Sequence, residues 1–500
     1  MSDGRWRPAA WCAAGILFVV LATANGGGYR YATSDQAFYI PAIVRVLVPE
    51  AFPRDAALID AQARLMVFDE IAAALVRLTG LSLDTLFLAG YLLTLALVWM
   101  ALVLIGTRVF SSPWAIVALG AAFTLRHRIP RTSANSFEPY LHPRMIAFAL
   151  GLLALAAVLR RRMTVAFVLV AGAVVIHLTT ALWWTVVLAV ATGVLDVRAR
   201  RLLVFAAPAV LIVAILVAAS GLLAAPMARM DETWLTAVAS KDSLFPSDWP
   251  LWAWAANLAL PAMLWMAHRA RAARGAASEE DRAVVWGGLA LAGVFLATLP
   301  LVLARWALPA QFQISRVFWL LDVLALLYVL ALLLPPGAHR RARIVAAVLV
   351  SASVARGAYV MLVEFPSRPL VRTGLANSDW HDAMEWISTQ PIDVHVLADP
   401  GHAWKYGTSV RASAGRDTLL EDTKDTAVAI YSRDVALRVN ERAGALRDFD
   451  RLTAERAAAL AQQYDLDFLV TEQPLALPVA YRSGKLVVYR LDPGSPTGDR

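Results

Sequence analysis

The sequence predicts a polytopic α-helical membrane protein, with about eleven transmembrane helices followed by a small soluble α/β domain. Three observations predict this fold class. Hydrophobic residues make up 59% of the 500 residues, and the mean hydropathy of +0.58 is far above that of a soluble chain of this length. Long apolar runs recur up to residue 362. Beyond that residue the chain is rich in acidic residues, and its apolar residues follow helix and strand periods.

Apolar runs of sufficient length define the expected spans. A helix that crosses the hydrocarbon core needs about 20 mainly apolar residues, because each residue adds roughly 1.5 Å to a core about 30 Å thick. Several runs are shorter than this. We expect spans at residues 9–27, 84–106, 112–125, 144–159, 163–177, 179–195, 202–224, 251–267, 283–303, 315–334 and 343–362.

Arginine clusters predict the orientation of these spans. They lie before the first span and on alternate loops after it, at Arg5 and Arg7 and at residues 160–162, 198–201, 269–274 and 340–343. Arginine is enriched in cytoplasmic loops. The pattern therefore predicts a multi-pass membrane protein with a cytoplasmic N-terminus and a periplasmic or extracellular C-terminal domain. The membrane we expect is the bacterial inner (plasma) membrane. The arginine pattern also accounts for the net charge of +8 without a nucleic-acid partner.

The first span also has the form of a signal peptide, with Ala22-Thr23-Ala24 as a cleavage site. Under either alternative, the loop at residues 28–83 is exported. Within this loop, residues 66–79 mix charged and apolar residues and predict a helix lying on the membrane surface. We therefore expect a transmembrane domain over residues 1–362 that includes this exported loop.

The C-terminal segment is expected to fold as a separate domain. Residues 363–492 predict an exported α/β domain, and residues 493–500 predict a disordered tail. The expected helices lie at residues 379–389, 425–443 and 453–464, and the expected strands at 394–397, 468–471, 479–482 and 485–491.

Exported carboxylates are the first candidates for chemistry. Asp35 lies just beyond the first span, where a carboxylate can serve as a general base. Alternatively, it caps the helix that begins at Gln36. Asp55 and Glu138 are further exported carboxylates that can assist or hold a divalent cation, although their spacing from Asp35 matches no metal motif. No metal ligand or cofactor is assigned, and a divalent cation remains open.

Arginines on the exported side are the second group of candidates. Arg128, Arg131 and Arg144 lie on the loop between the third and fourth spans, and Arg316 lies near the start of a later span. Arginine binds phosphate through bidentate hydrogen bonds, which makes these four residues candidate phosphate ligands. The alternative partners are anionic headgroups, Glu138, or Asp322 in the case of Arg316.

Short motifs add a resemblance to a known family. The run Asp35-Gln36-Ala37-Phe38-Tyr39 resembles the Asp-Glu-Ala-x-Tyr signature of GT-C-fold membrane glycosyltransferases of the mannosyl- and aminoarabinosyl-transferase type. The order of parts is also similar, with one span, a long exported loop, a many-span body and an exported domain. Further motifs resemble bacterial GT-C-like membrane proteins, namely His142-Pro143-Arg144, Trp380 with Trp386, and Ser409 with Arg411. Gln36 replaces the second acidic residue of the signature.

The resemblance implies transfer of a sugar from a polyprenyl-phosphate donor to an exported lipid, glycan or protein acceptor. Asp35 would be the general base, and the arginines would stabilise the departing phosphate. Membrane lipid would be a further partner. Tyr39, Asp55, Glu138 and His142 are expected to have supporting roles.

Two other function classes remain open. A lipid or polysaccharide transporter would have charges or broken helices at mid-membrane, which few of the expected spans contain. A non-catalytic scaffold would keep the GT-C-like fold without needing Asp35. ATP-driven transport is disfavoured, because the sequence has no glycine-rich loop followed by Lys-Ser or Lys-Thr.

Overall fold

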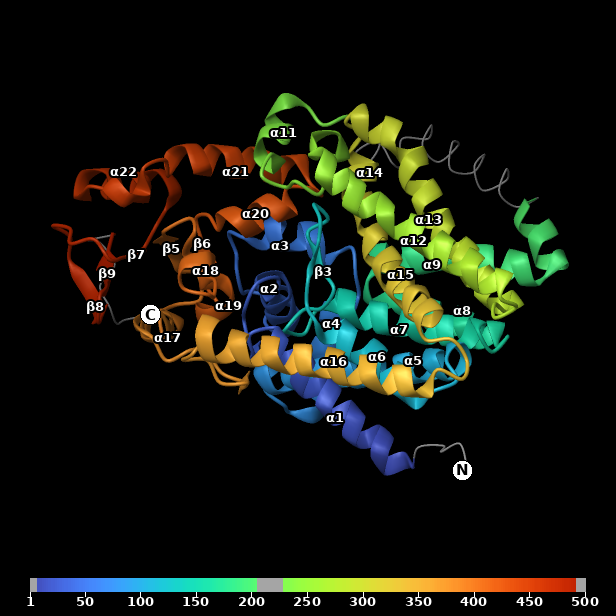
Figure 1. Cartoon of the computed structure of the whole chain (residues 1–500). Helices are drawn as coiled ribbons and strands as arrows, with labels where there is room; N and C mark the ends of the chain where they lie inside the picture. The colour runs from blue at the N-terminus through green and yellow to red at the C-terminus, as the bar shows by residue number, and fades with distance from the viewer. Residues whose placement is uncertain (1–6, 205–227, 492–500) are drawn as a thin grey trace. The chain divides into compact units, whose positions relative to one another are not determined.

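The computed structural model describes residues 7–204 and 228–491. The chain divides into two compact units (Figure 1). Unit 1 comprises Met1–Tyr29, Ala89–Arg229 and Lys241–Val371, and unit 2 comprises Arg30–Leu88, Met230–Ser240 and Arg372–Arg500. Each unit is therefore assembled from segments that are far apart in the sequence.

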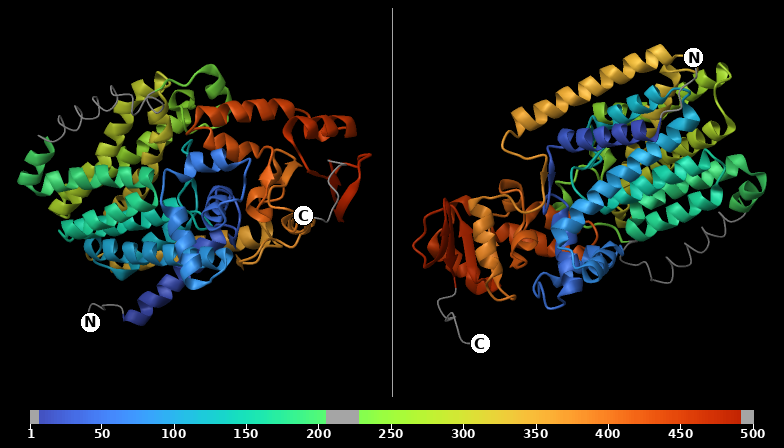
Figure 2. Two further views of the ribbon diagram at one scale, coloured as in Figure 1. Left: turned by 180° about the vertical axis from the view of Figure 1, so that it is seen from behind. Right: turned by 90° about the horizontal axis from the view of Figure 1, so that it is seen from below.

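Unit 1 is built from helices that run side by side (Figure 2). The closest neighbours are α7 with α8, α9 with α13, α6 with α16 and α12 with α15. The helices are α1 (Pro8–Asn25), α5 (Leu83–Val109, whose first turns belong to unit 2), α6 (Pro113–Thr124), α7 (Pro143–Val158), α8 (Met163–Ile176), α9 (Leu178–Leu195), α12 (Leu251–Ala273), α13 (Glu279–Leu303), α14 (Ala307–Gln311), α15 (Val317–Leu333) and α16 (His339–Tyr359). Short 3-10 turns lie at Pro246–Asp248 and Ile314–Arg316, and α16 continues into a π-helical turn at Val360–Glu364.

The described residues contain six helices long and apolar enough to cross a membrane, so the expectation of about eleven spans is wrong. The six are Pro8–Asn25, Leu83–Val109, Leu178–Leu195, Glu279–Leu303, Ala307–Leu333 and His339–Glu364. Each matches an expected span. These apolar helices are those of a membrane-embedded protein.

The five remaining expected spans fall on shorter or less apolar helices, or outside the described residues. Those at 112–125, 144–159 and 163–177 fall on α6, α7 and α8, which have 12, 16 and 14 residues and are shorter than the hydrocarbon core requires. The span at 251–267 falls on α12, where tryptophans, an asparagine and a proline dilute the apolar run. The span at 202–224 lies almost entirely outside the described residues.

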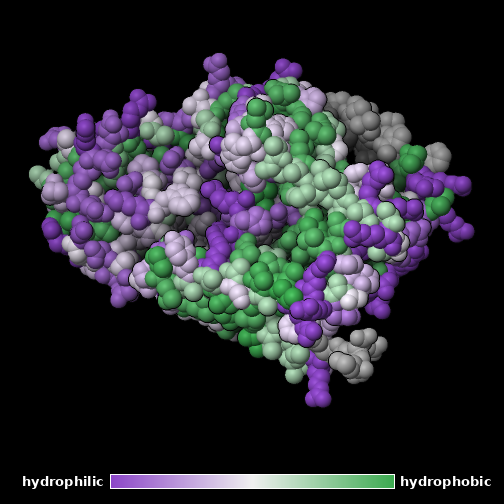
Figure 3. Space-filling model, in the orientation of Figure 1, coloured by the Kyte–Doolittle hydropathy of each residue, from purple (hydrophilic) through white to green (hydrophobic). Residues whose placement is uncertain are grey.

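The outer surface of unit 1 is apolar, as a lipid-facing surface would be. Figure 3 shows wide hydrophobic areas over its helices, whereas the C-terminal part of unit 2 is mainly hydrophilic. Phe167, Val168 and Met266 are among the exposed apolar residues of unit 1. Between its helices, large rings fill the interior, as where Phe148 stacks on Trp319 with ring centres 4.3 Å apart.

Several arginine-bearing turns lie at one end of unit 1. Arg161, between α7 and α8, contacts Glu279 and Glu280 at the start of α13, each at 2.5 Å. The turn that carries residues 269–274 immediately precedes that start. Tyr328, near the end of α15, donates a hydrogen bond of 3.0 Å to Asp281 at the same end. The clusters at 160–162 and 269–274 are therefore neighbours in space.

The first and last long helices of unit 1 share a direction. Asn25, at the end of α1, donates to the Ser353 hydroxyl at 3.0 Å, and Arg356 donates to the Asn25 carbonyl at 2.8 Å. Both contacts join the C-terminal ends of α1 and α16. The two N-terminal ends, which carry Arg7 and residues 340–343, consequently point the same way.

The first segment of unit 2 forms three helices, α2 (Gln36–Leu47), α3 (Ala56–Ala63) and α4 (Phe68–Thr79). Helix α2 packs against both α3 and α4. The helix expected at 66–79 is α4. It ends at Gly80, which adopts a left-handed conformation with φ of 68° that favours glycine.

The C-terminal segment of unit 2 builds a five-stranded sheet of order β6-β5-β7-β9-β8. Strand β5 (His395–Ala398) is parallel to β6 (Asp417–Thr418) and β7 (Phe468–Thr471), and β9 (Leu486–Arg490) is antiparallel to β7 and β8 (Val479–Ser483). The helices of unit 2 outside residues 36–79 are α11 (Glu232–Val238), α17 (Asp379–Ser388), α18 (His402–Lys405), α19 (Val410–Ala414), α20 (Asp422–Val428), α21 (Arg433–Ala445) and α22 (Ala454–Tyr464), with a 3-10 turn at Phe449–Arg451. The helix expected at 425–443 is divided between α20 and α21, because Ser432 caps the start of α21. Two-residue strands also form β1 (Tyr29–Arg30) with β4 (Val371–Arg372), and β2 (Arg128–Ile129) with β3 (Ala134–Asn135).

The two segments of unit 2 pack together through their helices. Helix α2 contacts α19, and α3 contacts α20. The segment at residues 30–88 therefore belongs with the C-terminal segment in one compact body. This body holds the first candidate site.

Candidate functional site

Asp35 precedes the first turn of α2, but its side chain does not cap the helix. Its carboxylate instead accepts a hydrogen bond of 2.8 Å from the ammonium group of Lys424. The Asp35 side chain is 30% exposed and the Lys424 side chain 8%. The capping alternative is thus not the one that the structure adopts, and the carboxylate is held by a distant part of the chain.

Lys424 places this ion pair beside a pocket. It belongs to α20, and its ammonium lies 5.2 Å from the centre of the Phe38 ring. Phe38 lines the pocket, as does Asp425, the residue after Lys424. The Asp35–Lys424 pair therefore borders the pocket without lining it.

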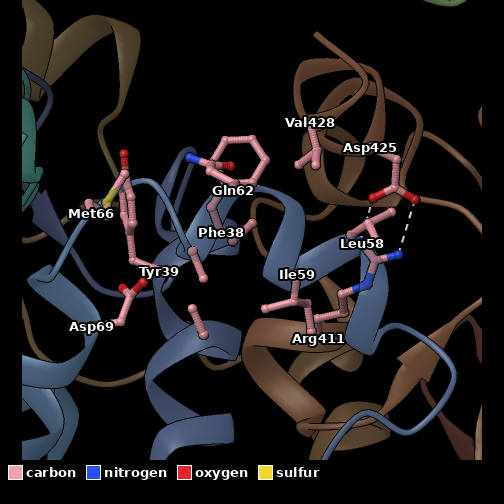
Figure 4. A pocket seen from close by; sticks show the side chains of 13 residues that line it. Phe38, Tyr39, Leu58, Ile59, Gln62, Met66, Asp69, Arg411, Asp425 and Val428 are labelled. Carbon is pink, nitrogen blue, oxygen red and sulfur yellow. Dashed lines mark hydrogen bonds and ion pairs between the residues drawn. The ribbon is translucent and has the colours of Figure 1, made fainter. Parts of the chain in front are cut away.

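The pocket lies within unit 2 between α2, α3, α4, α19 and α20, and it encloses about 360 Å³ of empty space, part of it open to solvent (Figure 4). Its wall is mostly apolar. The larger lining residues are Phe38, Tyr39, Leu58, Ile59, Gln62, Met66, Asp69, Arg411, Asp425 and Val428. Tyr39, Met66 and Asp69 lie on one side, and Arg411 and Asp425 lie on the other.

Asp69 is a buried acid in this wall. It is 2% exposed, and its Oδ1 atom has no hydrogen-bond partner among the described residues. Burial, assisted by the charge of Glu70, raises the pKa of Asp69 to about 8. Asp69 is consequently a neutral carboxylic acid at pH 7 and can donate a hydrogen bond.

The opposite wall is closed by a buried ion cluster around Arg411. Its guanidinium donates to Asp55 at 2.6 Å and to Asp425 at 2.5 and 3.0 Å. Arg438 also donates to Asp55, and the backbone N–H of Thr418 donates to it at 3.1 Å. The two aspartates that pair with Arg411 are therefore matched with hydrogen bonds, which a buried ion pair requires to be tolerated.

The charges of this cluster hold Asp55 in its ionised form. Although burial by itself acts in the opposite direction, Arg411 and Arg438 lower the pKa of Asp55 well below its ordinary value. Burial and the nearby charge of Asp55 raise the pKa of Asp417 to about 6. Burial also raises the pKa of Glu421 to about 7. With its carboxylate enclosed on all sides, Asp55 contributes to the stability of unit 2.

Unit 1 holds the second group of candidates, around Arg144. This residue is 2% exposed, and its guanidinium donates to Glu138 at 2.9 Å. It also lies 5.5 Å from the centre of the Trp319 ring. Trp319 is three residues after Arg316, and residues three apart share a face of a helix. The fold thereby brings Arg144 close to the turn that carries Arg316.

The remaining candidates described for unit 1 are His142, Arg131 and Arg128. The His142 ring accepts a hydrogen bond of 3.0 Å from the backbone N–H of Arg144 and lies 6.2 Å from the His177 ring. His142 therefore caps α7 and fixes its first turn. Arg131 donates to Asp242 at 3.0 Å at an exposed site, and Arg128 is exposed.

Asp322, an expected partner of Arg316, lies 3.0 Å from His127. The Asp322 carboxylate and burial act in opposite directions on His127, and the net effect raises its pKa. Glu138 also lies 3.6 Å from Arg126. The acidic residues of this region are thus engaged with cationic side chains.

The candidate residues divide between the two units. Those of unit 2 are Asp35, Tyr39 and Asp55, and those of unit 1 are Arg128, Arg131, Glu138, His142, Arg144 and Arg316. Sequence reasoning missed Lys424 and the role of Asp69. No local signal marks Lys424, because its partner lies 389 positions away. The described residues contain no group of three or more His, Cys, Asp or Glu side chains placed to hold a metal ion.

No model of a known protein family matches the sequence, and a comparison with curated proteins finds no match.

The Arg411 cluster predicts a large effect of a single substitution on stability. Asp55→Asn removes a charge that faces two buried or half-buried arginines, and we expect it to lower the free energy of unfolding by about 3–5 kcal/mol. Thermal melting of the purified full chain measures this. Arg45→Gln, which removes an exposed ion pair with Asp60 of 3.3 Å, is the control and should cost less than about 1 kcal/mol. Equal effects of the two substitutions would contradict the structural role of Asp55.

Asp69 predicts a dependence of stability on pH. Between the ordinary pKa of 3.8 and the folded value of about 8, the folded chain keeps a proton that the unfolded chain has lost. The contribution of Asp69 to stability therefore falls as pH rises through this window. Asp69→Asn should be more stable than the unmodified chain by at least about 2 kcal/mol at pH 7.5. The two melting curves should converge near pH 4, and a constant difference across this range would show that Asp69 titrates normally.

Proposed function

We propose that this protein is a membrane glycosyltransferase that moves a sugar from a polyprenyl-phosphate donor to an acceptor at the outer face of the membrane. One observation carries the proposal. The Asp35 carboxylate is free of helix capping, is partly exposed, and is held by Lys424 at the border of a pocket. The Asp-x-Ala-x-Tyr resemblance and the six apolar helices are its further support.

In the proposed reaction, Asp35 is the general base. It accepts the proton of the acceptor hydroxyl or amine as that atom bonds to the anomeric carbon of the sugar. The bond between this carbon and the phosphate oxygen breaks, and the phosphate leaves with the electron pair. Lys424 orients the carboxylate, and its ammonium is available to the negative charge that develops on the phosphate.

Arginines of unit 1 are proposed, by themselves, as a binding site for a phosphate group of a lipid-linked donor. Arg128 and Arg131 are exposed, Arg316 is partly buried, and Arg144 is buried against Glu138. A phosphate that reached Arg144 would compete with Glu138, so Arg144 acts in this proposal mainly by positioning the turn that carries Arg316. Arg131 would contribute from the surface after leaving Asp242.

A non-catalytic scaffold is the alternative, and the Asp35–Lys424 pair also favours it. An ion pair between α20 and the start of α2 can serve to join two segments of unit 2 without any chemistry. A substitution at Asp35 that lowers turnover would favour the enzyme. A substitution that lowers only stability would favour the scaffold.

The proposed orientation places the N-terminus in the cytoplasm and unit 2 outside the inner membrane of a bacterium, which requires an odd number of membrane crossings. Six crossings would return the C-terminus to the cytoplasm, so the proposal includes at least one crossing besides the six long apolar helices of the described residues. Its support is the grouping of the arginine clusters at 160–162 and 269–274 and the shared direction of α1 and α16. An alkaline phosphatase fusion after Leu362 should therefore be active, and a fluorescent cytoplasmic reporter at the same point should be dark. The reverse pattern would rule out the orientation and the outer-face reaction with it.

Replacing Asp35 tests the proposed chemistry. Asp35→Asn keeps the size of the side chain and a hydrogen-bond acceptor for Lys424 but removes the base. We expect turnover to fall by about 10²-fold or more, while the melting temperature changes little. The assay follows consumption of a radiolabelled polyprenyl-phosphate sugar by the full chain in nanodiscs, with lipid, glycan and peptide acceptors.

Two further variants make this result specific. Asp60→Asn removes another exposed carboxylate of the same segment and should leave turnover unchanged. Lys424→Met removes the partner and should lower both turnover and stability. Normal turnover in Asp35→Asn would exclude the general-base role, and a loss of stability without any transfer by the unmodified chain would favour the scaffold.

A further inference from the structure

We propose that the pocket between α2, α3 and α4 binds an uncharged membrane lipid, or a molecule like one, whose slender apolar chain carries a hydroxyl or carbonyl oxygen next to Asp69. The inference goes beyond sugar transfer and does not rest on it. It assigns a ligand to a cavity and to a buried acid that the proposed reaction leaves unused.

The pocket contains a buried acid with an unsatisfied oxygen atom. Asp69 is almost completely buried and lines the pocket, and its Oδ1 atom has no hydrogen-bond partner among the described residues. A buried polar atom without a partner costs free energy. A ligand oxygen placed beside the carboxyl group would remove that cost, so the site has a built-in preference for a hydrogen-bond acceptor.

The charged groups around the pocket favour an uncharged ligand. Burial and Glu70 keep Asp69 protonated at neutral pH, because they raise its pKa. The other charged or titratable groups that face the pocket are Tyr39 of α2 and, on the far wall, Arg411 and Asp425. Arg411 is already engaged by two carboxylates. Among the described residues that line the pocket, Arg411 is therefore not available to an anionic ligand, which favours a neutral oxygen.

The lining of the pocket favours an apolar chain. The wall is lined by Phe38, Leu58, Ile59 and Met66 among other apolar residues, around about 360 Å³ of empty space that is partly open to solvent. A mostly apolar lining with a few placed polar groups is the usual form of a small-molecule site, and such a lining suits the methylene chain of a lipid.

Exposed apolar side chains beside the pocket identify the membrane as the source of the ligand. Met66 lies beside Asp69 in the pocket (Figure 4), and its two neighbours in the chain, Leu65 and Val67, are 41% and 47% exposed. Leu78, on the same helix as Asp69, is 82% exposed. Exposed apolar side chains beside a pocket are typical of a surface that contacts lipid. The chain of a lipid would enter past Met66 and end at Asp69.

Photolabelling tests this proposal in the full chain, reconstituted in nanodiscs. The probe is decanol carrying a diazirine in its chain, and mass spectrometry locates the labelled residues. We expect labelling around Tyr39 and Met66 that unmodified decanol competes away and that decane and decanoate leave in place. Decane lacks the oxygen, and decanoate is charged.

Variants at Asp69 decide whether the acid is responsible. Asp69→Leu should reduce the labelling about fivefold, the equivalent of one hydrogen bond. Asp69→Asn should retain it, because the amide still donates. In the unmodified chain the labelling should decline as pH rises above about 8, whereas Asp69→Asn should show no such decline. Asp60→Asn, at an exposed site on α3, is the matched control and should behave as the unmodified chain.

Several outcomes would overturn the proposal. Unchanged labelling in Asp69→Leu, with a normal melting temperature, would show that the acid does not bind the probe. Equal competition by decane would reduce the pocket to a non-specific apolar surface. Label spread over the lipid-facing helices, with none in the pocket, would leave the pocket as a site for buried water alone.

Discussion

Unit 2 depends on the burial of one guanidinium group. Arg411 comes from the C-terminal segment, and it is neutralised by Asp55 from the segment at residues 30–88 and by Asp425 from α20. Because an unpaired buried charge costs several kcal/mol, these three side chains must meet whenever unit 2 is folded. Their meeting fixes α3 against α20, and α20 in turn carries Lys424 to Asp35. The position of the candidate carboxylate is thus a consequence of a structural ion cluster.

The same body holds two acids in opposite states. Asp55 is ionised because two arginines surround it, whereas Asp69 is neutral because apolar residues surround it. Asp35 differs from both, since its side chain is 30% exposed. A solvent-accessible carboxylate can exchange protons with an acceptor, which neither of the enclosed acids can do as directly. This difference in environment is the physical basis for choosing Asp35 among the acids of unit 2.

Much of the secondary structure could be predicted from the sequence, because it depends on local patterns. The apolar runs at 84–106 and 283–303 predicted α5 and α13, and the strand-favouring run at 468–471 predicted β7 to the residue. The number of spans was overestimated where apolar runs were short, as in α6 and α8, since hydropathy does not report where a helix ends. The existence of α4 could also be predicted from its mixture of charged and apolar residues.

The pairing of distant residues could not be predicted in this way. The Asp35–Lys424 and Asp55–Arg411 contacts join positions 389 and 356 residues apart, and no spacing rule in a single sequence connects such positions. The state of Asp69 was equally hidden, because a charged residue in an amphipathic helix ordinarily faces water. Its burial depends on α2 packing over α4, which is a tertiary property.

A density map of the full chain in a nanodisc, with a polyprenyl-phosphate sugar bound, tests the central claim most directly. The proposed function predicts that the anomeric carbon of the sugar lies within reach of the Asp35 carboxylate, with the phosphate on the side of Lys424. Sugar density remote from Asp35, or an unoccupied site at saturating donor, would contradict it.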